Sequence, residues 1–469
     1  MTEVVQSEFF ESVQDERYNV LSEHKIAIDG SSSSILISKK PAWNMGGSSN
    51  GVVNAVSGKQ CQFRVFSSSD IRSYLPYFAI LVKGHASKTV NGAEVSVNYN
   101  QVGIDWDACG TLIKNAYIRF NGNSALAETY QNSRYNVSHK LRMLTTLSRQ
   151  MIEGDSSIFF TPCIESGREL KTGLTPECAA RGRRWLSSET TANTAGGIVY
   201  HTRMFPLSHV FACCAIPGFS KLNIIDIVVE WSRTDQILFQ TSTDTNQNNY
   251  IIDDVSIVVD QTKLSAPQAS IELKEQRSGR DVQRSAYSYY EICQQSYVQN
   301  AKLIVPTCEN LQGVIFTFPS TADNNGINST QFILNDISSY SVMYDGQQVT
   351  DIPITIDTQN RMTNCELYYH YRKLIHKEYC TNYVPAIPAY EGFLAPLLTT
   401  SPRLYGENYG LMCTALWNSD AFHLHAKGAQ VEIMTNQQST GTSPTTAFIC
   451  LVRMLGFQIN PDSTTDVMN

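Results

Sequence analysis

The sequence predicts an all-β fold of two tandem β-sandwich domains, and three observations support this prediction. The composition favours strands, because the 469 residues include 23 Tyr and 19 Phe while charged residues make up 17 %, below the roughly 25 % of typical soluble domains. The length suits two sandwiches of about 200 to 250 residues each. One order of elements also occurs twice, each time around an aromatic–Asn/Asp–Gly turn, FNG at 120–122 and YDG at 344–346.

In the first half, alternating or continuous apolar residues predict strands on both sides of the FNG turn. The alternating residues 116–120 lead into the turn itself. The other predicted strands are 60–66 (QCQFRVF), 74–82 (YLPYFAILV), 223–231 (NIIDIVVEW) and 253–264 (DDVSIVVDQTKL). Ile225, Ile227, Val229 and Trp231 alternate along one of them, so we expect these four side chains to share one face.

A helix and a long loop separate the early strands from the late ones in this half. Val137, Leu141, Leu144 and Met151 recur at helical spacing, which predicts one amphipathic helix. The segment 153–202 that follows is rich in Gly, Ser and Thr, so we expect it to be a long loop.

The second half repeats the order strands, turn, helix, loop and closing strands. Its predicted strands are 310–318 (NLQGVIFTF), 331–334 (QFIL), 429–437 (AQVEIMTNQ) and 445–459 (TTAFICLVRMLGFQI). Thr363 and Glu366 form a capping box at the start of the predicted helix. Its apolar face consists of Leu367, Tyr371, Leu374 and Ile375.

The two turns are predicted to be structural residues that close equivalent hairpins in the two domains. They consist of Asn121 and Gly122 in the first half and Asp345 and Gly346 in the second. Asn-Gly and Asp-Gly tolerate the positive φ of type I′ hairpin turns, whose twist matches that of the flanking strands.

Each many-stranded domain with one helix and long loops is most economically a jelly roll. The predicted domains are an N-terminal arm at 1–40, a first jelly roll at 41–264 containing the long loop 153–202, a linker at 265–284 and a second jelly roll at 285–469. The linker is polar and charged, holds a Pro and has room for a short helix.

The charge and the cysteines exclude several classes of protein. The net charge of −7 and the pI near 5.8 argue against direct binding of nucleic acid, which needs clustered Lys and Arg; the one dense basic patch is RGRRWL at 181–186. The N-terminus does not resemble a secretory signal, and the sequence contains no apolar run of about 18 residues that would predict a membrane span. We therefore expect synthesis in the cytoplasm or nucleus, with the 12 scattered cysteines as free thiols.

No pattern predicts a catalytic, cofactor-binding or metal site. His423 and His425 stand at metal-ligand spacing on a predicted strand, but the nearest following carboxylate, Glu432, lies seven residues later and no His follows. The glycine-rich loop 46–51 is not followed by a helix, which a phosphate cradle would need. Asp105 and Asp107 are explained equally well by Asx hydrogen bonds in a β-turn. We predict no cofactor and no enzyme activity.

Three segments resemble the double jelly-roll major capsid proteins of polinton-like viruses, adintoviruses and virophages, with adenovirus hexon as a distant relative. They are 110–122 (GTLIKNAYIRFNG), 205–231 (FPLSHVFACCAIPGFSKLNIIDIVVEW) and 340–353 (YSVMYDGQQVTDIP). The resemblance implies a homotrimer that forms a pseudo-hexameric capsomer of an icosahedral DNA-virus shell, and localisation in the virion. The implied partners are neighbouring capsomers and penton and minor capsid or cement proteins, and the family has no catalytic residues to transfer.

Two other functions remain open from the residues alone. One is a β-sandwich module that binds carbohydrate or a receptor, as in lectins and adhesins, although the missing signal sequence and the free thiols argue against it. The other is a metal-dependent jelly-roll enzyme, for which His423 and His425 are the only support.

Overall fold

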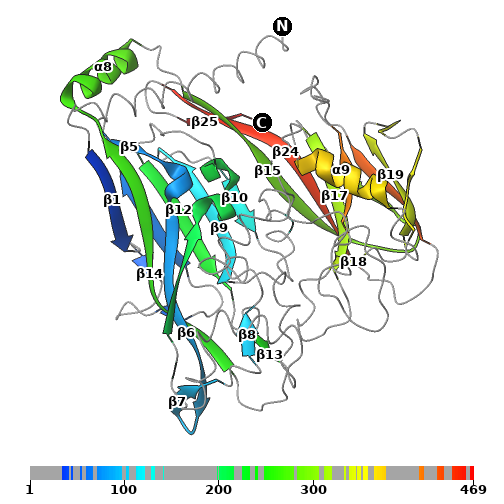
Figure 1. Ribbon diagram of the computed structural model, residues 1–469, viewed down its shortest axis with the longest axis horizontal. Helices are drawn as coiled ribbons and strands as arrows, with labels where there is room; N and C mark the ends of the chain where they lie inside the picture. The colour runs from blue at the N-terminus through cyan, green and yellow to red at the C-terminus, as the bar shows by residue number, and fades with distance from the viewer. Residues whose placement is uncertain are drawn as a thin grey trace.

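The chain folds into two β-sandwiches that lie side by side in the computed structural model (Figure 1). The structure describes residues 34–41, 44–45, 53–54, 60–66, 71–97, 102–104, 112–121, 128–131, 141, 198, 200–215, 224–232, 238–240, 248–278, 283–305, 311–319, 332–333, 337–344, 346–349, 352–357, 364–375, 411–416, 430–437, 446–460 and 465–468. All pairings between the strands named below are antiparallel.

Two facing sheets form the first sandwich. One sheet has the order β1 (Ser34–Pro41), β14 (Asn248–Lys263), β6 (Ala79–Val90) and β11 (Tyr200–Pro206), with the short strands β3 (Val53–Asn54), β5 (Ile71–Ser73) and β7 (Ala93–Ser96) attached. The other has the order β10 (Glu128–Gln131), β9 (Ile113–Phe120), β12 (Ile224–Trp231), β4 (Gln60–Phe66) and β2 (Asn44–Met45). The strands β8 (Val102–Ile104) and β13 (Leu238–Gln240) pair separately.

The second sandwich is built in the same way. In one sheet, β15 (Gln283–Ser296), β24 (Thr446–Ile459), β17 (Leu311–Pro319) and β22 (Met412–Ala415) lie side by side, joined by β18 (Phe332–Ile333) and β25 (Thr465–Met468). In the facing sheet the order is β16 (Lys302–Val305), β23 (Val431–Gln437) and β19 (Ile337–Tyr344), with β20 (Gln347–Gln348) and β21 (Ile354–Thr355) on its edge.

The same strand order in both sandwiches is that of a jelly roll. The eight main strands of the first are β1, β4, β6, β9, β10, β11, β12 and β14 in chain order, and those of the second are β15, β16, β17, β19, β20, β22, β23 and β24. Numbered from one to eight, they form a 1-8-3-6 sheet facing a 2-7-4-5 sheet in each case. The predicted fold class, two tandem jelly rolls, is therefore confirmed.

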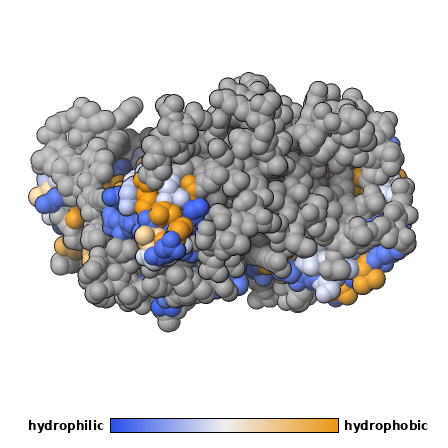
Figure 2. Space-filling model, turned by 90° about the horizontal axis from the view of Figure 1, so that it is seen from below, coloured by the Kyte–Doolittle hydropathy of each residue, from blue (hydrophilic) through white to orange (hydrophobic). Residues whose placement is uncertain are grey.

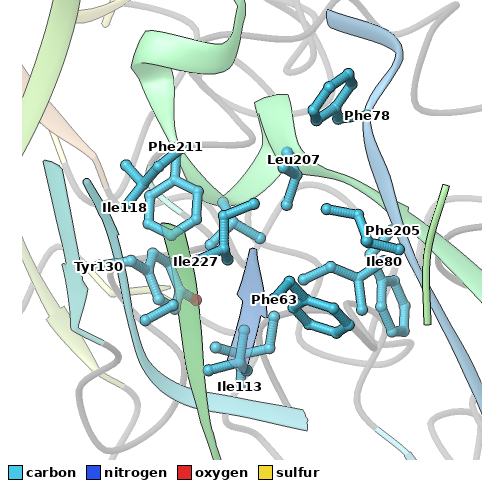
Figure 3. Packing of buried hydrophobic residues seen from close by; sticks show 14 of the residues in the cluster. Phe63, Phe78, Ile80, Ile113, Ile118, Tyr130, Phe205, Leu207, Phe211 and Ile227 are labelled. Carbon is cyan, nitrogen blue, oxygen red and sulfur yellow. The ribbon is translucent and has the colours of Figure 1, made fainter. Parts of the chain in front are cut away.

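The core of the first sandwich lies between its two sheets, as Figure 3 shows. Aromatic and branched side chains from both sheets meet there, among them Phe63 on β4, Ile80 on β6, Ile118 on β9 and Phe205 on β11. The predicted inward face of β12 is confirmed, because Ile225, Ile227, Val229 and Trp231 are all fully buried. Alternation along a strand places these residues on one side of the sheet.

The strand predicted at 74–82 is wrong in its first part. Leu75–Tyr77 form the 3₁₀ helix η1, and β6 begins only at Ala79 and runs on to Val90. Pro76 lies in the first turn of η1, where its fixed φ suits a turn and its missing N–H is not needed.

The helix predicted in the second half is confirmed as α9 (Cys365–Ile375). Leu367, Tyr371 and Leu374 are buried on its inner face. Glu366 lies in its first turn, whereas Thr363, the other half of the predicted capping box, lies outside the described residues. Of the helix predicted from Val137 to Met151, only Leu141 is described, and it is helical and fully buried.

Three strands begin inside segments that were predicted to be an arm, a loop or a linker. β1 begins at Ser34, inside the segment 1–40 predicted as an arm, and β11 begins at Tyr200, inside the predicted loop 153–202. The third, β15, begins at the end of the predicted linker 265–284, where the helix α8 (Ala266–Arg277) takes the place expected for a short helix. The strand β15 is polar, yet it pairs with β24 over its whole length, which apolar periodicity alone could not indicate.

Candidate functional site

The second predicted turn is a tight hairpin between β19 and β20. Tyr344 pairs with Gln347, so two residues connect the strands. Gly346 has a φ of 72°, the left-handed conformation that such turns require and glycine adopts without strain. Asp345 lies outside the described residues.

The first predicted turn is longer. Asn121 follows β9 with a φ of 55°, but the pairing of β9 with β10 begins only at Ile118 and Glu128. Asn121 instead extends the pairing with β12, because its backbone N–H donates to the Ile224 carbonyl at 2.7 Å and its side-chain Oδ1 accepts from the Ile224 N–H at 3.2 Å. Gly122 lies outside the described residues. Both predicted turns follow the fourth strand of their sandwich, and their equivalence remains a prediction.

A third turn of the same kind, which was not predicted, joins β6 to β7. Val90 pairs with Ala93 across the β6–β7 hairpin, and the two residues between them, Asn91 and Gly92, have φ values of 51° and 79°. These are the two positive φ values of a type I′ turn. The signal was present, because this Asn-Gly dipeptide also separates two stretches of strand-forming residues.

The residues weighed for chemistry lie outside the described part of the chain. They are His423, His425, Asp105, Asp107, the loop 46–51 and the basic patch 181–186. Among the residues that are described, no group of three or more His, Cys, Asp or Glu is arranged to hold a metal ion. Within the same residues, no helix has the length and apolar character needed to span a membrane.

The described cysteines are free thiols, and most of them are core residues. Burial raises the pKa of Cys61, Cys213, Cys413 and Cys450. Since the thiolate is the nucleophilic form, a raised pKa makes these thiols unreactive. They pack as small hydrophobic side chains.

A buried polar site lies at the seam between the two sandwiches. Glu128, at the start of β10, is buried and accepts hydrogen bonds from the backbone N–H groups of Ala212 and Cys213, both at 2.8 Å. Those two residues begin the 3₁₀ helix η5 (Ala212–Ala215). Two donors satisfy a buried carboxylate that would otherwise be costly.

The second sandwich covers this site with β15. Tyr287 of β15 is buried in the core of the first sandwich, and β15 contacts η5. Burial, and then the neighbouring Cys213 and Glu128, raise the pKa of Tyr287 far above its ordinary range, so its hydroxyl stays neutral. Tyr289, two residues on, forms a hydrogen bond with Thr129 of β10.

Each sandwich also contributes apolar side chains to the core of the other. Tyr287, Leu455 and Ile459 of β15 and β24 belong to the core of the first sandwich, whereas Leu141 belongs to that of the second. In Figure 1, β15 and β24 run along the side of the second sandwich that faces the first. This interlocking fixes the two jelly rolls as one unit.

The outer faces of the two 2-7-4-5 sheets carry similar mixtures of side chains. On the first sandwich, the Arg64 guanidinium pairs with Asp226, with Nη2 3.0 Å from Oδ2, and Lys114 Nζ lies 2.8 Å from Glu230 Oε1. On the second, Ile304 is 43 % and Met434 is 47 % exposed. The second face also carries the ion pair of Lys302 Nζ with Glu432 Oε2 at 2.7 Å, and the first also exposes Phe66, so both faces combine ion pairs with exposed apolar side chains.

Exposed apolar side chains are scattered over both sandwiches and α8. Among the described residues, the large ones are Phe66, Tyr77, Tyr200, Ile271, Leu273, Val298, Ile304, Val349, Ile352, Tyr369 and Met434. On the face shown in Figure 2, hydrophobic residues form small patches among hydrophilic ones. Scattered apolar side chains of this kind are normal on a protein surface and do not by themselves mark a contact site.

Comparison with known proteins identifies the fold by structure alone. No family model and no curated protein matches the sequence. The crystal structure of the mavirus major capsid protein is similar over 92 % of this chain and 89 % of its own, with a TM-score of 0.51 at 11 % identity. A chain in the cryo-EM structure of the Sputnik virophage is similar over 92 % of this chain and 88 % of its own, with a TM-score of 0.52 at 12 % identity. The chain therefore has the double jelly-roll fold of these proteins.

Proposed function

We propose that this chain is the major capsid protein of an icosahedral double-stranded DNA virus and that it acts as a homotrimer in the virion. The observation that carries the proposal is the presence, in one chain, of two jelly rolls with the same strand order, interlocked at a seam. The full-length similarity to the mavirus major capsid protein supports it.

The doubled fold has a geometric reason in such a shell. Three copies of a chain with two similar domains place six domains around one axis, which imitates six-fold symmetry. Hexagonal tiles of this kind fill the faces between the five-fold vertices of an icosahedron. The tile needs a fixed arrangement of the two jelly rolls, which the interlocked cores provide.

From the same role we infer the partners of this chain. The partners are neighbouring capsomers and penton and minor capsid or cement proteins. Because the chain carries a net charge of −7, we assign condensation of the genome to other, basic proteins. No catalytic step is assigned to this protein.

The mass and shape of the purified protein test the proposal. Native mass spectrometry is expected to give a trimer of three 52.4 kDa chains, and negative-stain electron microscopy a hexagonal particle. A monomer that binds glycans on an array would instead support a lectin-like module and would overturn the proposal.

A further inference from the structure

The tip of the β6–β7 hairpin is an Asn-Gly dipeptide that stands clear of the rest of the described structure. Asn91 and Gly92 are the two residues between the paired Val90 and Ala93, and both are exposed. A Cβ added at Gly92 would meet no atom within 4 Å. In Figure 1, β7 marks the end of the first sandwich opposite α8. The dipeptide is therefore open to solvent.

An asparagine that is followed by glycine can lose its side-chain amide without an enzyme. The backbone nitrogen of Gly92 attacks Asn91 Cγ, and a bond forms between these two atoms. The bond from Cγ to Nδ2 breaks, and the amide leaves as ammonia with the proton of the Gly92 N–H, so that a succinimide ring remains. Water then adds to one of the two ring carbonyls and opens the ring. Addition at one carbonyl gives aspartate, and addition at the other gives isoaspartate, in which the main chain runs through the side-chain carbon.

The local structure leaves both reacting groups unengaged. Glycine has no side chain to shield its backbone nitrogen, and within the described residues the Gly92 N–H makes no backbone hydrogen bond. The Asn91 amide likewise has no hydrogen-bond partner in the described part of the chain. Ring closure requires the turn to open briefly, and exposed chain ends and loop tips are the places where such local opening costs least.

A second copy of the same dipeptide, Asn121 and Gly122, lies in a different environment. The Asn121 backbone N–H donates to the Ile224 carbonyl at 2.7 Å, and its Oδ1 accepts from the Ile224 N–H at 3.2 Å. Both hydrogen bonds tie Asn121 to β12, so its side chain must be released before it can react. The other two Asn-Gly dipeptides of the chain, 50–51 and 325–326, lie outside the described residues.

We propose that Asn91 is a site of spontaneous deamidation that alters the β6–β7 hairpin as the protein ages. Aspartate keeps the turn, because Asp-Gly also suits a type I′ hairpin, and it adds a negative charge near the exposed Glu94. Isoaspartate lengthens the main chain by one carbon between Val90 and Ala93, which face each other in the hairpin. Their register then no longer matches, and the pairing at the tip is lost.

Peptide mass spectrometry of the full-length protein in its native assembly tests this proposal. The protein is aged at physiological temperature and mildly alkaline pH in heavy-oxygen water and then digested in ordinary water, so that the label marks only the modification that occurs during ageing. Asn91 is expected to be modified roughly tenfold faster than Asn121, the effect of the hydrogen bonds that Asn121 must break first. Both aspartate and isoaspartate are expected at position 91, since direct hydrolysis of the amide would give aspartate alone.

The variant Gly92→Asp separates attack by the backbone nitrogen from simple exposure of the amide. Aspartate tolerates a positive φ, and its Cβ would meet no neighbouring atom, but its side chain shields the attacking nitrogen. Modification of Asn91 is expected to fall to the rate of Asn121 or below, while Asn121 itself is unaffected. Equal rates at Asn91 and Asn121 in the wild type, an Asn91 that stays unmodified, aspartate without isoaspartate, or an unchanged rate in Gly92→Asp would overturn the proposal.

Discussion

At the scale of single residues, buried polar side chains hold the described structure together across long distances in the sequence. Glu128 accepts from two N–H groups 84 and 85 residues away, and His85 meets Asp253 168 residues away. A buried carboxylate or imidazole is stable only when its hydrogen bonds are satisfied. Both residues therefore depend on the complete fold, and each helps to fix one connection in it.

Replacing Glu128 by glutamine tests the seam. In Glu128→Gln the side chain has one oxygen where the carboxylate has two. One of the N–H groups of Ala212 and Cys213 would then face the amide NH2 group and lose its acceptor. A buried donor left without its acceptor costs about 1–3 kcal/mol. We expect the free energy of unfolding, measured by urea denaturation, to fall by about that amount.

The matched control is Glu432→Gln in the second sandwich. Glu432 Oε2 pairs with Lys302 Nζ at 2.7 Å, but the Lys302 side chain is 46 % exposed, and such surface pairs contribute about 0–1 kcal/mol. If both variants lost the same free energy of unfolding, the two buried hydrogen bonds of Glu128 would contribute no more than a surface ion pair.

At the scale of elements, α9 shows how an amphipathic pattern becomes structure. The buried side chains of α9 pack into the core of the second sandwich, where the helix contacts β22. Where α9 meets β17, Gly313 leaves room for the helix: a Cβ there would lie 2.2 Å from Leu374 Cδ1. The absence of a side chain at Gly313 therefore lets Leu374 of α9 pack close to the sheet.

Alanine substitutions on the buried and exposed faces of α9 are expected to differ in how much stability they cost. Leu367 is 1 % exposed, so Leu367→Ala leaves a cavity and is expected to lower the stability by about 2–5 kcal/mol. Tyr369 is 50 % exposed, and Tyr369→Ala is expected to cost about 0.5 kcal/mol or less. Thermal unfolding of both variants measures the difference, and equal melting temperatures would contradict the packing of α9 against the core.

At the scale of the whole molecule, the interlocked cores join the two jelly rolls into one unit. The outer faces of both 2-7-4-5 sheets carry ion pairs beside exposed apolar side chains. In a ring of three copies, the first sandwich of one copy would lie beside the second sandwich of the next. The predicted loop 153–202 and the predicted arm 1–40 are further candidates for contacts between copies.

Deleting Ser166–Ser188 tests the contribution of the long loop. This segment holds the basic patch RGRRWL, and we expect its removal to lower the yield of trimer in native mass spectrometry without unfolding the sandwiches. Circular dichroism provides the control for folding. An unchanged amount and thermal stability of trimer would show that the loop does not contribute to contacts between subunits.

The sequence by itself determined the fold class, most of the long strands and the helix α9. Strands such as β12 and β24 bury apolar residues in a regular order, and this order is a local property that periodicity can reveal. The tight turn at Gly346 was predictable for the same reason, because the backbone chemistry of Asp-Gly does not depend on distant residues.

Only the tertiary structure decided the strand order, the seam and the carboxylate contacts of His85. Nothing local distinguishes Glu128 from other glutamates or shows that the polar strand β15 pairs along all of β24. These features arise when segments far apart in the sequence meet and exclude water, because burial then gives a carboxylate or an imidazole a defined set of partners. The sequence lists such residues, but their partners are chosen by the packing of the complete chain.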